Sequence, residues 1–241
     1  MRRTAVLFAG VLLAGCSASG GSEGLAPSTG PERTTTTTVS EAATAAGYTI
    51  RSLGGTRLSV TAGTGAPIAF DGAATQRPAG WPTDLEMMTI PGPSMQPAIP
   101  PKGRILVDRD ASAARSATRG QVVLAETPAS LDSSIVEVVR RVVAVGGERI
   151  VVRGGKVTID GKVVDEPYTA GTVTNANPQC GDDAPPGLGG AGFVVSEDSV
   201  FVLGDNRVNS VDSRCYGEVP RRSLTALVLY EVAPTSAVGP L

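Results

Sequence analysis

Two dipeptides, Gly154-Gly155 and Asp160-Gly161, divide the run ERIVVRGGKVTIDGKVV into short segments rich in valine and isoleucine. Residues of these types accept the positive φ angles that two-residue hairpin turns require, so the run predicts two tight β-hairpins. Similar apolar segments lie before and after it: LEMMTI, RILVDR, GQVVLAE, IVEVVRRVVAV, SVFVLGD and LTALVLYEV. No helix is strongly indicated after Asp84. We therefore expect a mostly β fold.

Composition excludes several classes of function. The 241 residues include 30 glycines and 18 prolines but only 18% charged residues, which suits a loop-rich β protein. A formal net charge of -2 does not favour nucleic-acid binding, so we expect no nucleic acid among the partners. The chain has no histidine, which excludes a histidine-based catalytic dyad or triad and an imidazole ligand for a metal. We expect neither a metal nor a cofactor.

The N-terminus has the pattern of an export signal. Two arginines precede an apolar stretch that ends near Leu13, and this stretch is shorter than the roughly 20 apolar residues that span a bilayer. The sequence Leu13-Ala14-Gly15-Cys16 resembles the lipobox of bacterial lipoproteins, which implies that Cys16 is diacylated and begins the mature chain. Two acyl chains anchor a protein stably, so we expect a lipid anchor in the membrane. A plain secretory signal is the alternative.

The chain divides into four segments. Residues 1–15 form the lipoprotein-type signal peptide, and residues 16–47 form a Ser/Thr/Gly-rich tether that has few large apolar residues to bury and is expected to be disordered. Residues 48–82 contain one strand-like stretch, RLSVTAG, and have no assigned role. Residues 83–241 form the β domain.

The cysteines suggest one disulfide. If Cys16 is lipidated, Cys180 and Cys215 remain as an even pair in an exported chain, and a disulfide between them is the simplest expectation. Two isolated thiols are the alternative, because pairing requires a proximity that sequence does not show. Cys180 lies in a long loop, residues 174–192, of the kind that is commonly functional or disordered.

Two adjacent arginines, Arg140 and Arg141, interrupt the valine-rich run VEVVRRVVAV. Successive side chains of a strand point to opposite faces, so Arg140 shares a face with three valines and an alanine: Val136, Val138, Val142 and Ala144. A guanidinium on an apolar face requires partners. Either the strand lies at a sheet edge and Arg140 reaches solvent, or polar groups lie inside.

Two polar stretches lie next to apolar strands. The first, IPGPSMQPAI, covers residues 90–99 and places Ser94 in a turn, where a serine on its own is usually a turn residue. The second, FVLGDNRVNSVDSRCYG, covers residues 201–217 and follows an apolar strand directly. Its many Asp, Asn, Arg and Ser side chains would be costly there unless they satisfy one another in a buried polar network.

With these stretches together, the chain resembles a type I signal peptidase, the membrane-bound serine endopeptidase that removes signal peptides from exported proteins. The similar motifs run from about residue 87 to residue 220. Ser94-Met95-Gln96-Pro97 resembles the box that holds the nucleophilic serine, and Glu166-Pro167-Tyr168 resembles the EPY-like element. The most specific match is Gly204-Asp205-Asn206-Arg207, which continues through Asn209-Ser210, Asp212-Ser213-Arg214 and Gly217. The resemblance implies a signal-peptidase-type antiparallel β catalytic core with long loops.

The resemblance also implies roles for individual residues. Ser94 is the nucleophile and its backbone N–H an oxyanion donor, Ser210 orients the base, and Asp212 forms a supporting ion pair with Arg214. Gly92 stands where some relatives have a second serine as oxyanion donor, so a second donor here would be backbone or water. Cys215 replaces the aromatic residue usual in that box, which favours its bond to Cys180. The other supporting residues are Met95, Asp205, Asn206 and Arg207.

Arg140 stands at the position of the family's general base. That base is a buried lysine, kept neutral by an apolar pocket that lowers its pKa so that it takes the proton of the serine. Arginine has a pKa above about 12 and does not lose a proton in proteins. The lysines of this chain are expected in a turn and around hairpins, where solvated, charged roles are usual: Lys102, Lys156 and Lys162. The site is therefore complete except for its base.

Three functions remain open. The first is an active but divergent signal peptidase at the outer face of the cytoplasmic membrane, in which Arg140 stabilises negative charge and another group or a water takes the proton. The second is a catalytically inactive homologue, a lipid-anchored lipoprotein that binds exported peptides. The third is a surface protein that uses the same β scaffold for an unrelated interaction.

Overall fold

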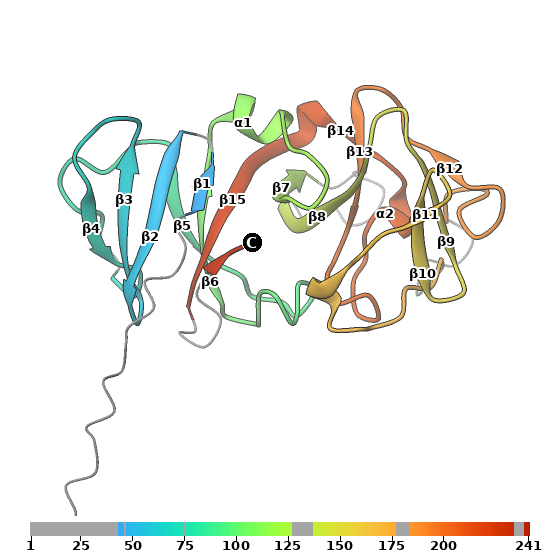
Figure 1. Ribbon diagram of the computed structural model, residues 1–241, viewed down its shortest axis with the longest axis horizontal. Coiled ribbons are helices and arrows are strands. Elements are labelled where there is room, and N and C mark those ends of the chain that lie inside the picture. Colours follow the sequence, from blue (N-terminus) through green and yellow to red (C-terminus); the bar gives the residue numbers. More distant parts are fainter. Residues whose placement is uncertain (1–42, 46, 75, 127–136, 177–183, 234–238) are drawn as a thin grey trace, which may run out of the picture. The chain divides into compact units, whose positions relative to one another are not determined.

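The computed structural model describes residues 43–45, 47–74, 76–126, 137–176, 184–233 and 239–241. All strand pairs in these ranges are antiparallel, and the strands form three sheets (Figure 1). Helices in the described ranges are short: α1 is Ala111–Arg115 and α2 is Ser213–Tyr216, and 3-10 turns cover Pro167–Thr169 and Arg221–Ser223. The expected mostly β, antiparallel fold is confirmed.

The largest sheet has eight strands and carries the sequence motifs. Its order is β14-β13-β8-β7-β15-β6-β5, and β16 pairs with β15. The strands are β5 (Leu85–Thr89), β6 (Arg104–Asp108), β7 (Val122–Glu126), β8 (Glu137–Val145), β13 (Ser199–Leu203), β14 (Val219–Pro220), β15 (Leu224–Ala233) and β16 (Gly239–Pro240). Six of these strands correspond to the apolar segments that predicted strands, whereas β14 and β16 were not predicted.

Strand β8, which carries both arginines, lies inside the sheet between β13 and β7. Its residues from Val139 to Ala144 are all buried, so both of its faces are covered. This excludes the sheet-edge alternative for Arg140. The expectation that Ala144 shares a face with Arg140 is wrong, because a register shift where β8 meets β13 breaks the alternation near Val143. Ala144 instead packs with Val143 and Phe201.

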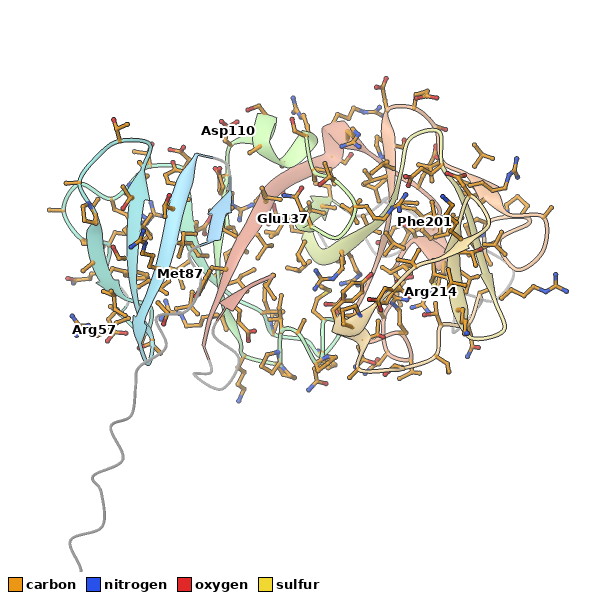
Figure 2. The ribbon with its side chains drawn as sticks, in the orientation of Figure 1. Arg57, Met87, Asp110, Glu137, Phe201 and Arg214 are labelled. Carbon is orange, nitrogen blue, oxygen red and sulfur yellow. The ribbon has the colours of Figure 1, made fainter. Side chains whose placement is uncertain are left out.

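A second sheet confirms the two predicted hairpins. Its order is β11-β10-β9-β12, with β9 (Arg149–Arg153), β10 (Lys156–Ile159), β11 (Lys162–Val163) and β12 (Phe193–Val194). Four residues with positive φ make the two turns: Gly154, Gly155, Asp160 and Gly161. Apolar side chains of this sheet pack around Phe201 of β13 in one buried cluster (Figure 2). The second sheet therefore covers one side of the strand that precedes the polar loop.

The segment 48–82 forms most of a third sheet, which sequence did not predict. Its order is β1-β2-β3-β4, with β1 (Ala43–Ala45), β2 (Tyr48–Gly54), β3 (Arg57–Ala62) and β4 (Ile68–Asp71). Ile50, Leu58 and Phe70 pack in one cluster with residues of the large sheet, and Met87 of β5 packs against that cluster (Figure 2). At Gly72 an added Cβ would lie 1.8 Å from Val232 Cγ1, so the two sheets approach too closely for any side chain there.

The predicted tether and anchor fall largely outside the described part of the chain. The tether prediction is wrong for residues 43–45, which pair with β2 as β1. The signal peptide, Cys16 and the rest of the tether lie outside the described residues. Over the ranges that are described, no helix is long and apolar enough to cross a membrane.

Candidate active site

Ser94 lies in the turn that follows β5 and is held from two sides. The next residue, Met95, is fully buried in a cluster with Ile90, Ile99 and Ile105, which anchors the turn to the core. On the other side, the backbone N–H of Asn206 donates to the Ser94 carbonyl at 3.0 Å, and Asn206 Nδ2 donates to the Pro93 carbonyl at 3.1 Å. The polar loop after β13 therefore fixes the backbone that carries the predicted nucleophile.

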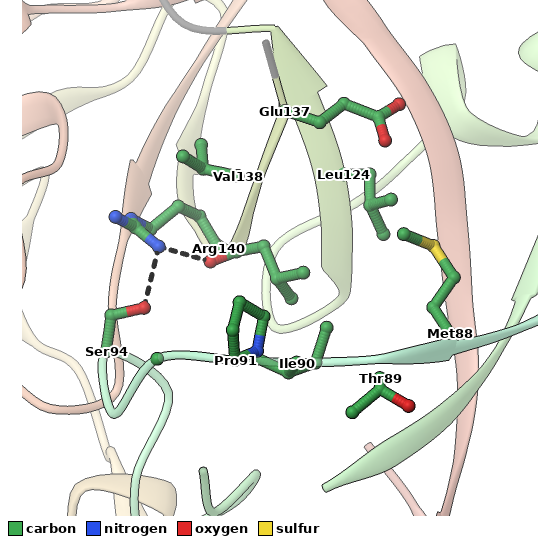
Figure 3. A pocket seen from close by; sticks show the side chains of 11 residues that line it. Met88, Thr89, Ile90, Pro91, Ser94, Leu124, Glu137, Val138 and Arg140 are labelled. Atoms are coloured by element: carbon green, nitrogen blue, oxygen red, sulfur yellow. Dashed lines mark hydrogen bonds between the residues drawn. The ribbon is translucent and has the colours of Figure 1, made fainter. Parts of the chain in front are cut away.

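The guanidinium of Arg140 contacts the Ser94 hydroxyl (Figure 3). Arg140 Nη1 donates to Ser94 Oγ at 2.9 Å and to the Val139 carbonyl at 2.6 Å. Arg140 Nε and Nη2 donate to the Val211 carbonyl at 3.3 and 2.7 Å. The polar groups predicted inside the fold are thus a hydroxyl and two backbone carbonyls.

The Tyr216 hydroxyl also lies beside this guanidinium, although not in the geometry of a hydrogen bond. Burial raises the pKa of the Tyr216 hydroxyl above its ordinary value, and the charge of Arg140 opposes that rise. Tyr216 is therefore neutral at neutral pH. Every group that faces the Arg140 guanidinium in the described chain is uncharged.

Arg141, the adjacent residue, is also buried, with 4% of its surface exposed. It forms a two-bond ion pair with Asp205, from Nε at 2.8 Å and from Nη2 at 2.7 Å. Its Nη1 donates to the Gly120 carbonyl at 2.7 Å, and the guanidinium lies 4.1 Å from the centre of the Tyr168 ring. Burial raises the pKa of the Asp205 carboxyl, and the Arg141 guanidinium opposes that rise. Arg141 therefore has a charged partner, whereas Arg140 has none in the described ranges.

Two further buried ion pairs complete the polar network predicted for residues 201–217. Arg207 binds both carboxylate oxygens of Glu166, at 3.0 and 2.6 Å, and donates to Thr174 Oγ1. Arg214 binds both oxygens of Asp212, at 2.8 and 2.7 Å. Asp212 also accepts from the Gly204 backbone N–H at 3.0 Å. These bonds hold the loop behind Ser94 in one conformation.

Ser210 lies close to Ser94, but its hydroxyl forms no hydrogen bond with Arg140. A Cβ added at Gly204 would lie 2.3 Å from Ser210 Oγ and 2.5 Å from the Ser94 carbonyl oxygen, so both serines crowd the same glycine. Within the described ranges Ser210 Oγ is buried and has no hydrogen-bond partner. Its role in orienting a base stays a prediction.

A pocket of about 380 Å³ opens beside Ser94 and Arg140. Its walls are mostly apolar: Met88, Ile90, Pro91, Leu124, Val138 and Val139. Figure 3 shows Ser94 and Arg140 at one side of the pocket and Glu137 at the other. Burial opposes the charged form of Glu137, but bonds from Arg109 and Thr225 outweigh it and hold the pKa of the carboxyl below its ordinary value. Glu137 is thus paired within the protein.

Gly92 also lines the pocket, and a Cβ added there would meet no atom within 4 Å. Cys215 lies in α2 and is disulfide-bonded, whereas its predicted partner Cys180 lies outside the described residues. Over the described ranges, no cluster of three His, Cys, Asp or Glu side chains could hold a metal ion.

Sequence reasoning missed several residues of this site. Glu137 lines the pocket and pairs with Arg109, and a glutamate three residues before Arg140 in a valine run was the available signal. The pairing of Arg141 with Asp205 was also missed, although both residues had been singled out. The Val211 carbonyl could not be found, because a backbone acceptor leaves no trace in side-chain patterns.

Comparisons with known proteins give a consistent result. A family model described as signal peptidase, peptidase S26, matches residues 81–232. The chain is 30% identical over 156 residues to a probable signal peptidase I-2 of Synechocystis sp., covering 64% of this chain and 66% of that protein. It is 29% identical over 160 residues to a signal peptidase I of Leptolyngbya laminosa, covering 65% of this chain and 72% of that protein.

The matched region thus spans about two thirds of the length of these curated relatives. A crystal structure of a signal peptidase I from Enterococcus faecalis is similar at a TM-score of 0.35 and 24% sequence identity, over 46% of this chain and 96% of that chain.

Proposed function

Because the chain belongs to the signal peptidase family, peptidase S26, we propose that it is a serine endopeptidase that cleaves signal peptides from exported proteins, with Ser94 as the nucleophile. The observation that carries this proposal is the hydrogen bond of 2.9 Å between Arg140 Nη1 and Ser94 Oγ at one side of an apolar pocket. Such a pocket suits an extended peptide with apolar side chains next to the cleaved bond. The arginine at the base position favours the inactive homologue, whereas the family match and the hydrogen bond to Ser94 favour a peptidase.

The backbone around Ser94 supports attack on a peptide carbonyl. In the described chain the Ser94 backbone N–H donates to no acceptor, so it is available to a developing oxyanion. Ser94 Oγ adds to the carbonyl carbon, the amine leaves with a proton, and water then hydrolyses the ester. Gly92 offers no side-chain donor, but the open space at its Cα leaves room for a water.

Arg140 has a different task from the lysine it replaces. A guanidinium does not accept a proton, because its pKa exceeds about 12. In our proposal its charge and its bond to Ser94 Oγ stabilise the alkoxide, and water in the pocket takes the proton. Without an internal base, the rate should rise about tenfold for each pH unit, in proportion to hydroxide.

The predicted lipid anchor on Cys16 is part of the same proposal. It would hold the domain at the outer face of the membrane, where signal peptides emerge. We expect the full chain to incorporate labelled palmitate and to sediment with membranes, and Cys16→Ser to lose both properties. Palmitate labelling that persists in Cys16→Ser would contradict a lipid anchor on Cys16, but it would not bear on the proposed activity.

Cleavage of a signal-peptide substrate by the purified full chain tests the activity. We expect cleavage by the wild type that rises with pH and disappears in Ser94→Ala. Ser196→Ala, at an exposed serine, is the matched control and should keep the wild-type rate. Arg140→Lys should be faster at neutral pH, by about 100-fold or more, because lysine supplies a base.

The pH profile separates the roles of Arg140 and its replacement. The rate of Arg140→Lys should level off above the pKa of the new lysine, whereas the wild-type rate should continue to rise. Cleavage that survives in Ser94→Ala would contradict the proposed nucleophile. A wild type that cleaves at no pH, beside an active Arg140→Lys, would contradict the proposed activity of the natural chain.

A further inference from the structure

Among the described residues, nothing compensates the charge of Arg140. Arg140 is 6% exposed, and in the part of the chain that the structure describes it has no carboxylate within ion-pair distance. Three other buried arginines each bind both oxygens of a carboxylate: Arg141, Arg207 and Arg214. A buried cation without a counter-charge is costly, so this site favours any anion that can reach it.

An anion can reach the site through the pocket. Arg140 and Ser94 both line it, and its other walls near them are apolar. Attraction between charges is stronger in such a poorly solvated space than in water. The other charged group of the lining, Glu137, is held by Arg109 and Thr225 and does not contact Arg140.

The hydrogen-bonding groups present suit a carboxylate. Ser94 Oγ accepts a hydrogen from Arg140 Nη1, so the Ser94 hydroxyl still has its own hydrogen to donate. A carboxylate next to Ser94 would accept that hydrogen and lie beside the guanidinium. Bonds of this charge-assisted kind are shorter and stronger than those between neutral groups.

We propose that this pocket binds peptides by their C-terminal carboxylate, with Arg140 as the residue that recognises its charge. The identity of the natural ligand rests on the proposed function, and this ligand would be the released signal peptide. Hydrolysis gives the acyl product a carboxylate whose carbon has just been bonded to Ser94 Oγ, and that oxygen is 2.9 Å from Arg140 Nη1. An uncleaved substrate presents a neutral amide at the same place, so Arg140 binds product more tightly than substrate.

Binding of a fluorescent signal-peptide fragment that ends in alanine tests the proposal. The fragment is made as the free acid and as the C-terminal amide, and each is titrated with the full-length chain. We expect the acid to bind about 10-fold more tightly than the amide, or better, and to inhibit cleavage competitively. Equal binding of acid and amide by the wild type would overturn the proposal.

Variants locate the effect. In Arg140→Met and Arg140→Gln the preference for the acid should vanish, while Arg140→Lys should keep it only below the pKa of the new lysine. Arg119→Gln, which removes a guanidinium from the surface, is the matched control and should keep the full preference. A preference that persists in a folded Arg140→Met or Arg140→Gln would overturn the proposal. Inhibition of acid binding by acetate, but not by acetamide, is expected.

The binding measurement involves no cleavage, so it separates the two proposals. A wild type that prefers the acid but cleaves no signal peptide would contradict the endopeptidase and keep the carboxylate site. A wild type that cleaves signal peptides but binds acid and amide equally would contradict the carboxylate site alone.

Discussion

Arg140 and Arg141 are neighbours on one strand, yet they sit in opposite electrostatic environments. Arg141 binds Asp205 through two hydrogen bonds and lies over the Tyr168 ring. Among the residues that the structure describes, Arg140 faces a serine hydroxyl, a tyrosine hydroxyl and two backbone carbonyls. The paired charge belongs to the scaffold that holds the loop behind Ser94. The unpaired charge is available to whatever enters the pocket.

This difference shows that the burial of an arginine does not by itself predict the effect of replacing it. Both side chains are more than nine-tenths buried, and burial by itself would class them together. What distinguishes them is the partner that would remain after a substitution. Removal of one member of a buried ion pair leaves an uncompensated charge, whereas removal of an unpaired cation leaves neutral groups.

The largest effect is expected for Arg141→Met. It leaves Asp205, which is fully buried, without its cation, so the free energy of unfolding should fall by about 3 to 5 kcal/mol. Urea denaturation measures this change. A second substitution, Asp205→Leu, should restore most of the loss, because it removes the stranded carboxylate.

The matched control is the same substitution one residue earlier. Arg140→Met should change the free energy of unfolding by no more than about 1 kcal/mol in either direction, because only neutral acceptors lose a partner. Equal losses for the two methionine variants would contradict the contrast between the two arginines.

A smaller effect is expected at Glu231, a buried carboxyl of β15 that has no cation partner in the described part of the chain. It is 1% exposed, and burial raises its pKa from the ordinary 4.5 to about 8. The folded state therefore holds this proton more tightly than the unfolded state. The contribution of Glu231 to the free energy of unfolding should be largest below about pH 4.5 and fall as the pH rises from about 4.5 to about 8.

Glu231→Gln removes this titration and should raise the free energy of unfolding by about 2 to 4 kcal/mol at pH 8, with little change at pH 4. Thermal unfolding of both proteins across this range measures the difference. A stability difference that stays constant with pH would contradict a raised pKa for Glu231.

The smallest effect is expected for an exposed ion pair. Arg119 bonds to Glu148 at the surface, and its side chain is 42% exposed. Arg119→Gln should lower the free energy of unfolding by about 0.5 kcal/mol or less, because solvent screens both charges. A loss as large as that of Arg141→Met would show that burial does not determine how much each ion pair contributes to the free energy of unfolding.

Much of the fold could be predicted from local signals. The hairpins at Gly154-Gly155 and Asp160-Gly161 follow from residues that accept positive φ. The faces of β8 could not be predicted, because alternation carries no information where both faces are buried, and a register shift near Val143 breaks it. The sheet of residues 43–71 was missed because its support is tertiary, from cluster contacts with the large sheet.

The site shows the same division. The motifs predicted that Ser94, Arg140 and the loop from Asp205 to Arg214 belong together, and the structure brings them into contact. Arg141 pairs with Asp205, and Arg140 has no carboxylate partner within the described ranges. Both facts depend on which of the two adjacent side chains points toward the loop. The packing of the sheet decides which arginine points toward the loop, and the residue types of the motif do not.

The adjacency of the two arginines also bears on how the strand finds its register while folding. A slip of β8 by one residue would turn each side chain to the other face and bring Arg140 to the position of Arg141. Asp205 would still meet an arginine, so the buried ion pair cannot reject the slipped pairing. Val139 would then lie beside Ser94. Other contacts of β8, such as the ion pair of Glu137 with Arg109, must therefore select the register in which Arg140 lies beside Ser94.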